Sequence, residues 1–207
     1  MLGPRVAAFL LQSHEAKGVT VTSRKMQELY RLVEGIETAM FTTRRRDGHL
    51  VSRPMATQKR SAGADFWFVT YRGSDKLEEI ARDPHVNLSY YRDRTREWVS
   101  VSGIAEASAN RRKIRELYSP DWRAWFGDEG GSKDGGPDDP RIVLIKVRAR
   151  QATFLTVDKP QPVVLFELLK GMVTGKRPRL GKTRRARAGD FGARKGRKTR
   201  GKRSSTA

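Results

Sequence analysis

The stretch from Asp65 to Tyr91 shows most clearly how apolar and polar positions alternate along this chain. Phe66 to Thr70 is a run of aromatic and β-branched residues of strand length, and a polar Tyr-Arg-Gly-Ser sequence closes it. Ser74 or Asp75 can then cap a short helix, which ends at the next Asp-Pro pair because the residue before proline disfavours the α conformation. Val86 to Tyr90 alternates again. The stretch therefore predicts a strand, a turn, a helix and a second strand.

Further strands are predicted on both sides of this stretch. The full predicted set is 38–43, 49–57, 65–70, 86–91, 97–107 and 141–157. A hairpin joins the first two, because Asp47-Gly48 is a typical hairpin-turn sequence. Antiparallel strands of this length, joined mostly by short turns, suit a small closed or partly split barrel. The predicted fold is therefore mainly β within the α+β class: a six-stranded antiparallel split β-barrel with flanking helices.

Helical segments flank the strands. Besides the helix after Ser74, they cover residues 22–36, 110–118, 120–126 and 163–173. The first of these has apolar residues at helical spacing, so it is expected to pack over one end of the barrel, with a partner-binding helix as the alternative. The short third segment holds Trp122, Trp125 and Phe126. Three aromatic residues so close together are typical of a core or of a protein interface.

Composition divides the rest of the chain into loops and extensions. Residues 1–21 show no strong period and predict a loosely ordered leader before a domain at 22–175. Residues 127–140 are rich in Gly and Asp and lack an apolar anchor, which predicts a mobile loop. Glycines and like charges predict a basic, disordered tail at 176–207. Of the formal charge of +20, 14 Lys and Arg against Asp190 give this tail +13 and leave +7 for the rest.

Composition also excludes several kinds of chemistry. The 207 residues can form an ordinary core and include no cysteine, so disulfides, thiolate catalysis and sulfur-ligated metals are excluded. The three histidines lie far apart in sequence and in different predicted elements, which disfavours a His-based metal site. No run approaches the roughly 20 apolar residues of a membrane span, and residues 6–11 are too short for a secretion signal. The expected localisation is cytoplasmic.

Arg53, Ser74 and Lys76 form a candidate anion site. Arg53 lies midway along the predicted strand 49–57 with no acid near it in sequence, while Ser74 and Lys76 lie at the start of a predicted helix. A helix start carries unpaired amides and a partial positive charge, and the hydroxyl and the ammonium add two donors. An arginine from a neighbouring strand would complete a three-point clamp for a phosphate. The alternative is that Ser74 only caps the helix and Lys76 is a solvated surface charge.

Several ordered motifs resemble those of a known family. They are Ser52-Arg53-Pro54-Met55, Trp67-Phe68-Val69-Thr70, Ser74-x-Lys76, Val86-Asn87-Leu88-Ser89-Tyr90 and Val99-Ser100-Val101-Ser102-Gly103. In this order, over about residues 25–175, the chain resembles the flavin-binding split barrels related to pyridoxamine 5′-phosphate oxidase. It looks most like their general stress protein branch. The resemblance implies FMN as the cofactor, with FAD, deazaflavin or haem as alternatives.

The resemblance also implies cofactor-binding roles. The residues concerned are Arg53, Pro54, Met55, Thr70, Ser74, Lys76 and Trp98. Met55 and the backbone around it would lie against the isoalloxazine ring. Thr70 would lie near the ribityl chain, and Trp98 would approach the ring from the other side; the three residues of the candidate anion site would bind the phosphate. As alternatives, Met55 and Trp98 are plain core residues and Thr70 a strand residue of high β propensity. The family implies a homodimer with flavin between the subunits, which favours an interface for the tryptophan cluster.

The sequence supplies no catalytic machinery of its own. It shows no nucleophile paired with a base, no close acid pair with an evident task and no metal cluster, so any reaction must come from a cofactor. Residues 160–175 form an apolar helix without histidine, whereas true pyridoxamine phosphate oxidases carry Arg and His there, so another activity is predicted. Two functions stay open. One is an FMN-dependent oxidoreductase linked to the stress response, and the other is a non-catalytic flavin-binding stress protein whose tail binds nucleic acid non-specifically.

The basic tail is the candidate nucleic-acid interface of the second function. Its candidate phosphate-binding residues are Lys182, Arg184, Arg185, Arg187, Arg194, Lys195, Arg197, Lys198, Arg200, Lys202 and Arg203. Such segments bind phosphate backbones through counterion release without reading sequence, so their affinity falls steeply with salt. A solubilising tail without a dedicated ligand explains the same composition. An anionic membrane surface is a weaker alternative, because nothing apolar in the tail would insert.

Overall fold

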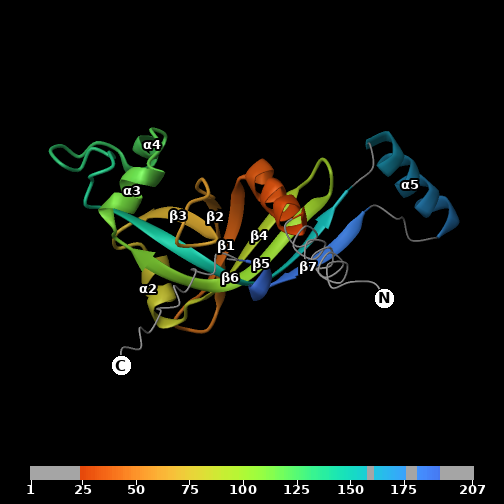
Figure 1. The fold of residues 1–207 in the computed structure, drawn as a ribbon, viewed down its shortest axis with the longest axis horizontal. Helices are drawn as coiled ribbons and strands as arrows, with labels where there is room; N and C mark the ends of the chain where they lie inside the picture. The colour runs from red at the N-terminus through yellow and green to blue at the C-terminus, as the bar shows by residue number, and fades with distance from the viewer. Residues whose placement is uncertain (1–23, 158–160, 176–180, 192–207) are drawn as a thin grey trace, which may run out of the picture.

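The computed structural model describes residues 24–157, 161–175 and 181–191, and the strands in these residues form one antiparallel sheet (Figure 1). The strands are β1 (Thr38–Arg44), β2 (Leu50–Ala56), β3 (Phe66–Tyr71), β4 (His85–Arg92), β5 (Glu97–Ser108), β6 (Ile142–Thr156) and β7 (Lys182–Arg187). A helix at 24–36 is followed by α2 (Asp75–Arg82), α3 (Arg111–Leu117), α4 (Trp122–Phe126), α5 (Gln161–Thr174) and the 3-10 turn η1 (Ala188–Asp190). Each predicted strand is present with bounds within one residue of the prediction, so the fold class is confirmed.

The order of the strands explains why the barrel is split. The sheet runs β2-β1-β4-β5-β6-β3, and β7 adds to β6 beside this path. The sheet curls until its two ends, β2 and β3, approach each other without forming a ladder. Just beyond β2, the N–H of Gln58 donates a hydrogen bond to the carbonyl oxygen of Trp67 at 2.8 Å. The barrel is therefore closed at this point and open farther along the two strands.

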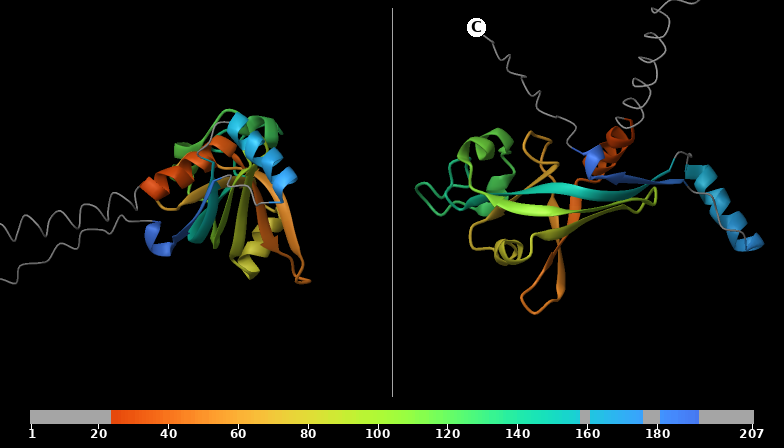
Figure 2. Two further views of the ribbon diagram at one scale, coloured as in Figure 1. Left: turned by 90° about the vertical axis from the view of Figure 1, so that its right-hand side faces the viewer. Right: turned by 60° about the horizontal axis from the view of Figure 1, so that its bottom comes forward.

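The core lies inside the curled sheet. One row of register partners crosses four strands and is between 0 and 1% exposed: Phe41, Leu88, Val101 and Ala152. The helix at 24–36 adds Leu29 and Val33 to the same cluster and lies across the sheet, as Figure 2 shows. Full burial of side chains of this size stabilises the fold by about 1.5–3 kcal/mol each. The amphipathic pattern of this helix therefore predicted its place correctly.

A second core lies between α3, α4 and the outer face of β3 and β6. Trp122 is 1% exposed in this cluster, and its indole N–H donates to Oε1 of Gln58 at 3.0 Å. Phe126 packs against the same cluster. The preference for an interface is therefore wrong for Trp122, which its own chain covers, whereas Phe126 is only partly buried. Trp125, which is 85% exposed, is the member of the trio that the chain leaves uncovered.

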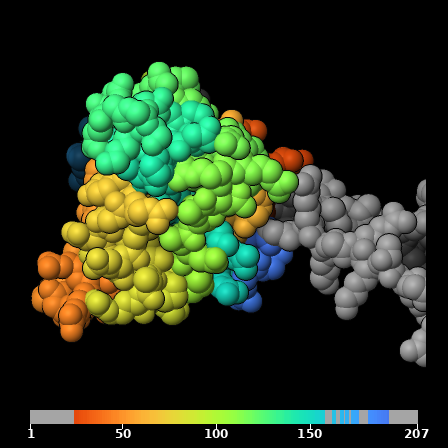
Figure 3. Space-filling view, turned by 90° about the vertical axis from the view of Figure 1, so that its left-hand side faces the viewer, coloured from red at the N-terminus to blue at the C-terminus, as the bar shows by residue number. Residues whose placement is uncertain are grey.

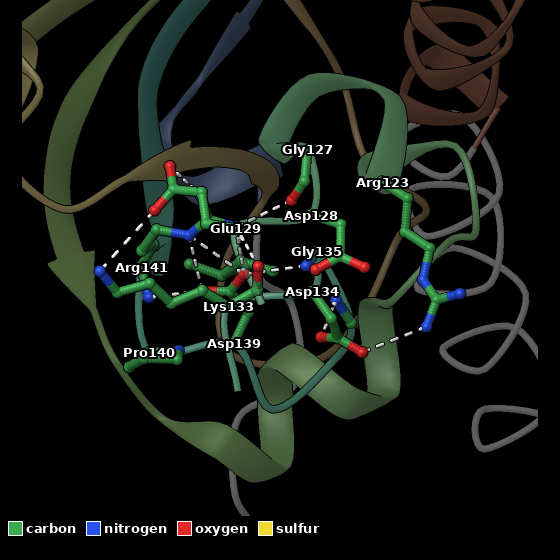
Figure 4. A network of polar contacts seen from close by, with 12 residues as sticks. Arg123, Gly127, Asp128, Glu129, Lys133, Asp134, Gly135, Asp139, Pro140 and Arg141 are labelled. Atoms are coloured by element: carbon green, nitrogen blue, oxygen red, sulfur yellow. Dashed lines mark hydrogen bonds and ion pairs between the residues drawn. The ribbon is translucent and has the colours of Figure 1, made fainter. Parts of the chain in front are cut away.

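The loop at 127–140 has a polar anchor instead of an apolar one. Asp139 is fully buried and forms an ion pair with Arg141, with 2.7 Å between Oδ2 and Nη2 (Figure 4). The same carboxylate accepts a hydrogen bond from the N–H of Gly135, and the Arg141 guanidinium donates to the carbonyl oxygens of Gly127 and Lys133. One buried ion pair thus organises a loop whose composition had predicted mobility. The sequence did not reveal this anchor, because an ion pair between neighbours in sequence leaves no apolar signature.

The predicted tail boundary at residue 176 needs correction. Residues 182–187 form β7, which pairs with the second half of β6. Ala186 is fully buried and Phe191 is 6% exposed, and Lys25 of the helix at 24–36 forms an ion pair with Asp190 at 2.6 Å. The prediction of a disordered tail is therefore wrong for 182–191, where a strand edge on β6 was available to pair with the basic sequence. The predicted leader at 1–21 and the tail beyond 191 lie outside the described residues.

Within the described ranges, no helix combines the length and the apolar character that crossing a bilayer requires. The same residues hold no group of three or more His, Cys, Asp or Glu side chains arranged for a metal ion. A cluster of cationic and hydroxyl side chains lies at the barrel split.

Candidate functional site

Arg53 lies on the edge strand β2, at the split of the barrel. Its register partner is Phe41 of β1, and Phe41 faces the core, so the Arg53 side chain leaves β2 on the inner face of the sheet. Nη1 of Arg53 donates to Oγ1 of Thr43 at 2.8 Å, and Nη2 donates to Oε1 of Glu79 at 2.9 Å. Thr43 in turn donates to Oε2 of Glu79 at 2.6 Å. Arg53 is thus held by a strand hydroxyl and by a buried acid of α2.

The turn from β3 into α2 brings a second cation to the same place. Gly73 has a φ of +87°, a left-handed conformation that glycine adopts without strain, and it redirects the chain into α2. Ser74 occupies the N-cap position as predicted, but its side chain does not cap the helix. Its hydroxyl instead lies 3.1 Å from Nζ of Lys76 and 3.2 Å from Oγ1 of Thr70. Lys76 also donates to Thr70 at 3.0 Å, so an ammonium and two hydroxyls form a compact triangle.

The pKa values show that Arg53 and the triangle share one electrostatic environment. Burial lowers the pKa of Lys76, and the positive charge of Arg53 lowers it further, against the opposing effects of Asp75 and Glu79. Burial alone would raise the pKa of Glu79, but hydrogen bonds from Arg53 and Thr43 hold it below its usual value. Glu79 is therefore ionised at neutral pH, and its charge does not fully offset the two cations.

This cluster of Arg53, Lys76, Ser74 and Thr70 is called the split-barrel clamp below. Ser74 is 2% exposed and Thr70 6% exposed, whereas the Arg53 side chain keeps 26% of its surface in contact with solvent. In the described part of the chain, the hydrogen bonds of the Lys76 ammonium go to hydroxyls and not to a carboxylate. Figure 3 shows the surface at this end of the molecule, where α2 lies below the loop at 127–140. Two cations and two hydroxyls arranged in this way can hold a small dianion such as a phosphate.

The structure brings together four of the seven predicted cofactor residues, namely the four that form the split-barrel clamp. The other three lie elsewhere. Met55 lies on the same inner face of β2 as Arg53 but is buried in the core at 8% exposure. Pro54 is exposed on the opposite face of β2. Trp98 also points to the outer face, because its neighbour Val99 is the inward residue, and three strand steps separate β5 from β2. The expected approach of Trp98 to the same ligand is therefore not met within one chain.

Sequence reasoning missed the two residues that orient Arg53. Arg53 has no acid near it in sequence, yet Glu79 reaches it from a helix 26 positions later. A signal was present, because Glu79 follows Lys76 by three residues and helical spacing places such residues side by side. Thr43 follows Ala39 and Phe41 in the inward alternation of β1, so its hydroxyl could also have been placed inside.

A cavity of about 430 Å³ lies near the other end of β2 and is separate from the clamp. Ala56, Thr57 and Gln58 line it, together with residues of the helix at 24–36 and of the segment around α3 and α4. It contains an Arg60 guanidinium 3.6 Å from the centre of the Tyr30 ring. Arg53, Ser74 and Lys76 do not contribute to its wall. The split-barrel clamp therefore lies outside this cavity.

Comparison with known proteins agrees with this fold. The family model described as pyridoxamine 5′-phosphate oxidase like matches residues 24–179, which is most of the chain. The chain belongs to the pyridoxamine 5′-phosphate oxidase-like family. The predicted relationship is confirmed, and so is the likeness to the general stress protein branch in fold.

Relatives of this family member come from fungi and bacteria. The protein bli-3 of Neurospora crassa is 35% identical over 164 residues, which cover 78% of each chain. A general stress protein 26 structure from Jannaschia sp. CCS1 has a TM-score of 0.62 at 23% identity and covers 80% of this chain and 99% of its own. A general stress FMN/FAD binding protein from Xanthomonas citri has a TM-score of 0.51 at 22% identity, covering 61% and 84%. At these identities the two structures support the fold alone.

Proposed function

We propose that this family member binds FMN at the split-barrel clamp and acts as an FMN-dependent oxidoreductase linked to the stress response. The observation that carries the proposal is that the positive charges of the clamp are only partly neutralised by acidic residues. Arg53 and Lys76 lie close enough for the charge of one to lower the pKa of the other, and among the described residues Glu79 is the single buried acid beside them. A bound phosphate dianion would supply the missing negative charge.

The residues present fit the phosphate end of FMN. Lys76, Ser74 and Thr70 offer an ammonium and two hydroxyls on one side, and Arg53 retains donors that its bonds to Thr43 and Glu79 do not use. An arginine held by an acid behind it is oriented before the ligand arrives, which reduces the entropy that binding must overcome. The part of β2 around Met55 remains the proposed neighbour of the ring, because Met55 lies on the same inner face as Arg53.

The bound flavin would supply the electron-transfer chemistry. The role of the chain is to bind and orient it. The name of the Xanthomonas citri relative includes FMN/FAD, which supports a flavin over a deazaflavin or a haem. The clamp has the size of a single phosphate, which favours FMN over FAD. A cytoplasmic homodimer with the flavin between subunits is part of the proposal, and it would give Trp98 of one chain access to the flavin of the other.

A second candidate function has one observation in its favour. Arg185 and Arg187 are exposed on β7, next to the basic sequence beyond the described residues. Arg184 contributes less, because Glu28 already forms an ion pair with it. A non-catalytic flavin-binding protein could use this strand to contact nucleic acid. Retention on immobilised DNA that falls steeply with salt would support it, while retention that does not depend on salt would contradict it.

The visible absorption spectrum of the purified full-length protein tests the proposed cofactor. We expect the absorption bands of an oxidised flavin, and release of FMN, identified by its mass, on denaturation. The spectrum of a haem or of a deazaflavin would contradict the assignment. If the protein is purified without cofactor, titration with FMN and with riboflavin distinguishes the role of the phosphate, because riboflavin lacks it and should bind at least about 100-fold more weakly.

A further inference from the structure

Helix α5 stands apart from the rest of the described chain. It projects beyond the end of the barrel at which β6 stops and β7 begins, away from the helix at 24–36 and from α3 and α4 (Figures 1 and 2). Thr156, the last residue of β6, pairs with Lys182, the first residue of β7. The chain therefore leaves the barrel and returns to it at one point, and α5 is the outer part of this excursion.

The exposed surface of α5 is apolar. Val163 is 41% exposed, Phe166 64%, Leu169 52%, Met172 79% and Val173 87%. Side chains of this kind present on the order of 500 Å² of apolar surface, which is comparable to the largest apolar patch of a typical soluble monomer, and such a patch is often functional. The sequence QPVVLFELLKGMVT contains only one acid and one base, so α5 lacks the polar face of an ordinary surface helix.

The apolar positions of α5 form a seam with two-fold symmetry. Pro162, Phe166, Leu169 and Val173 are all exposed and follow one another at intervals of four, three and four residues, the spacing of a coiled-coil seam. This spacing is the same in both directions along the chain. Its centre lies between Phe166 and Leu169 and coincides with the centre of the helix Gln161–Thr174. A seam of this kind can pair with an antiparallel copy of itself.

We infer that α5 docks antiparallel against α5 of a second copy of this chain. Helical geometry then places Phe166 opposite Leu169 of the second chain, and Pro162 opposite Val173. The apolar seam is therefore self-complementary.

A membrane surface fits α5 less well. The exposure of α5 removes one objection to membrane binding, since an apolar element does lie beside the basic strand β7. However, helices that lie in a bilayer interface carry a strongly basic polar face, and α5 contains Lys170 as its single base. Binding to a lipid surface also does not require the two-fold symmetric spacing of the apolar residues. Binding to lipid is therefore an outcome that the experiment has to exclude.

This inference deepens the dimer of the proposed function but does not depend on the flavin. The α5 pair supplies on the order of 500 Å² per chain, whereas a standard interface buries about 800 Å² per partner. Other surfaces of the barrel must therefore contribute to the dimer. Wild-type protein that is monomeric at about 50 μM would overturn both the dimer and the docking of α5.

Single cysteines test the antiparallel pairing, because the chain contains none. In Leu169→Cys the two sulfur-bearing residues lie about 4 Å apart along the axis, which permits a disulfide, whereas in Val173→Cys they lie about 16 Å apart, which does not. Val173 is the more exposed of the two, so random collisions would favour the control. We expect mild oxidation of the full chain to give a covalent dimer with Leu169→Cys only. Equal cross-linking of both variants, or of neither, would overturn the pairing.

A charge-bearing variant tests whether α5 stabilises the dimer. Phe166→Glu with Leu169→Glu should weaken dimerisation at least 100-fold, measured by sedimentation, while Leu50→Glu, which changes an exposed apolar residue at the start of β2, should leave it unchanged. An unchanged melting temperature of the monomeric variant and unchanged FMN binding would show that the barrel is intact. A dimer that survives the double substitution would refute the role of α5 without affecting the flavin proposal. If the wild-type protein is monomeric and binds vesicles of anionic lipid, the partner of α5 is a membrane and not a second copy of the chain.

Discussion

Two groups of charged side chains lie at the same end of the barrel and differ in how completely their charges are matched. In the loop at 127–140, Arg141 contacts both Asp139 and Glu129, with N–O distances of 2.7 and 2.6 Å. In the split-barrel clamp, Glu79 pairs with Arg53, and Lys76 has hydroxyl partners. The two groups are close, since the N–H of Arg72, beside the clamp, donates to the carbonyl oxygen of Arg141 at 2.6 Å.

The pKa values express the same difference. Hydrogen bonds from Arg141 lower the pKa of Asp139 to about 2, so the ion pair of the loop is stable without any ligand. In the clamp, burial and Arg53 lower the pKa of Lys76, which means that its charged form is less stable there than in water. A matched group therefore serves structure, whereas an unmatched group of cations is suited to an anionic ligand.

The largest effect is expected on flavin binding when both clamp cations are removed. Arg53→Ala with Lys76→Ala should weaken FMN binding at least about 100-fold, because each lost charge-assisted hydrogen bond contributes about 1.5–3 kcal/mol. The control is Arg72→Ala with Arg82→Ala, which removes two exposed cations from the same turn and helix. Titration of flavin fluorescence measures both. Equal losses in the two double variants would reduce the clamp to a general charge effect.

Breaking the ion pair in the loop at 127–140 should lower the stability of the protein and leave FMN binding unchanged. Asp139→Asn leaves Arg141 without its buried partner and should lower the free energy of unfolding by about 2–4 kcal/mol, measured by urea denaturation. Asp138→Asn is the control, because Asp138 and its partner Arg115 have side chains that are 62% and 59% exposed, and such pairs contribute about 0–1 kcal/mol. FMN affinity should stay unchanged in both. A large loss of affinity in Asp139→Asn would show that the loop belongs to the site.

The same comparison explains which parts of the structure the sequence could predict. The strands and the sheet class follow from alternation of apolar residues, and Ser74 and Lys76 could be placed together because a turn and a helix start are local features. Glu79 and Arg53 meet only because α2 crosses the split beside β2, which no local pattern specifies. The buried Asp139–Arg141 pair escaped notice for a different reason, since buried and exposed acids look alike in sequence.

Strand β7 shows a further limit of sequence reasoning. Composition alone classed Lys182 to Arg187 as disordered, because four of its residues are basic. Its partner, the second half of β6, offers an unpaired edge, and ladder hydrogen bonds do not depend on side chains. The buried Ala186 was the available signal, as a small apolar residue within a basic run.

Acid should weaken the loop over a defined range of pH. The folded-state pKa of Asp139 is lowered from 3.8 to about 2, so the stability that the ion pair contributes is complete above pH 3.8 and is lost as the pH falls towards 2. The difference in melting temperature between wild type and Asp139→Asn should therefore be constant above about pH 5 and shrink between pH 4 and 2. Acid-induced loss of structure elsewhere affects both proteins and cancels in this difference. A difference that does not vary with pH would contradict the charged state of Asp139.

Alkaline pH should weaken the clamp by a smaller amount. A bound phosphate favours protonated Lys76, and the pKa of Lys76 in the ligand-free protein lies below the usual 10.5, so FMN affinity should begin to fall before the pH reaches that value. Lys76→Arg should flatten this decline, because arginine stays charged at such pH values. Glu79→Gln should move the decline to lower pH, since the Glu79 charge raises the pKa of Lys76. The measurement is the dissociation constant of FMN between pH 7 and 10 for wild type, Lys76→Arg and Glu79→Gln. Titration of the flavin itself affects all three proteins equally, so differences among them report on Lys76. Identical profiles would show that the ammonium of Lys76 does not contact the phosphate, and the comparison of the two charge clusters would then depend on Arg53 alone.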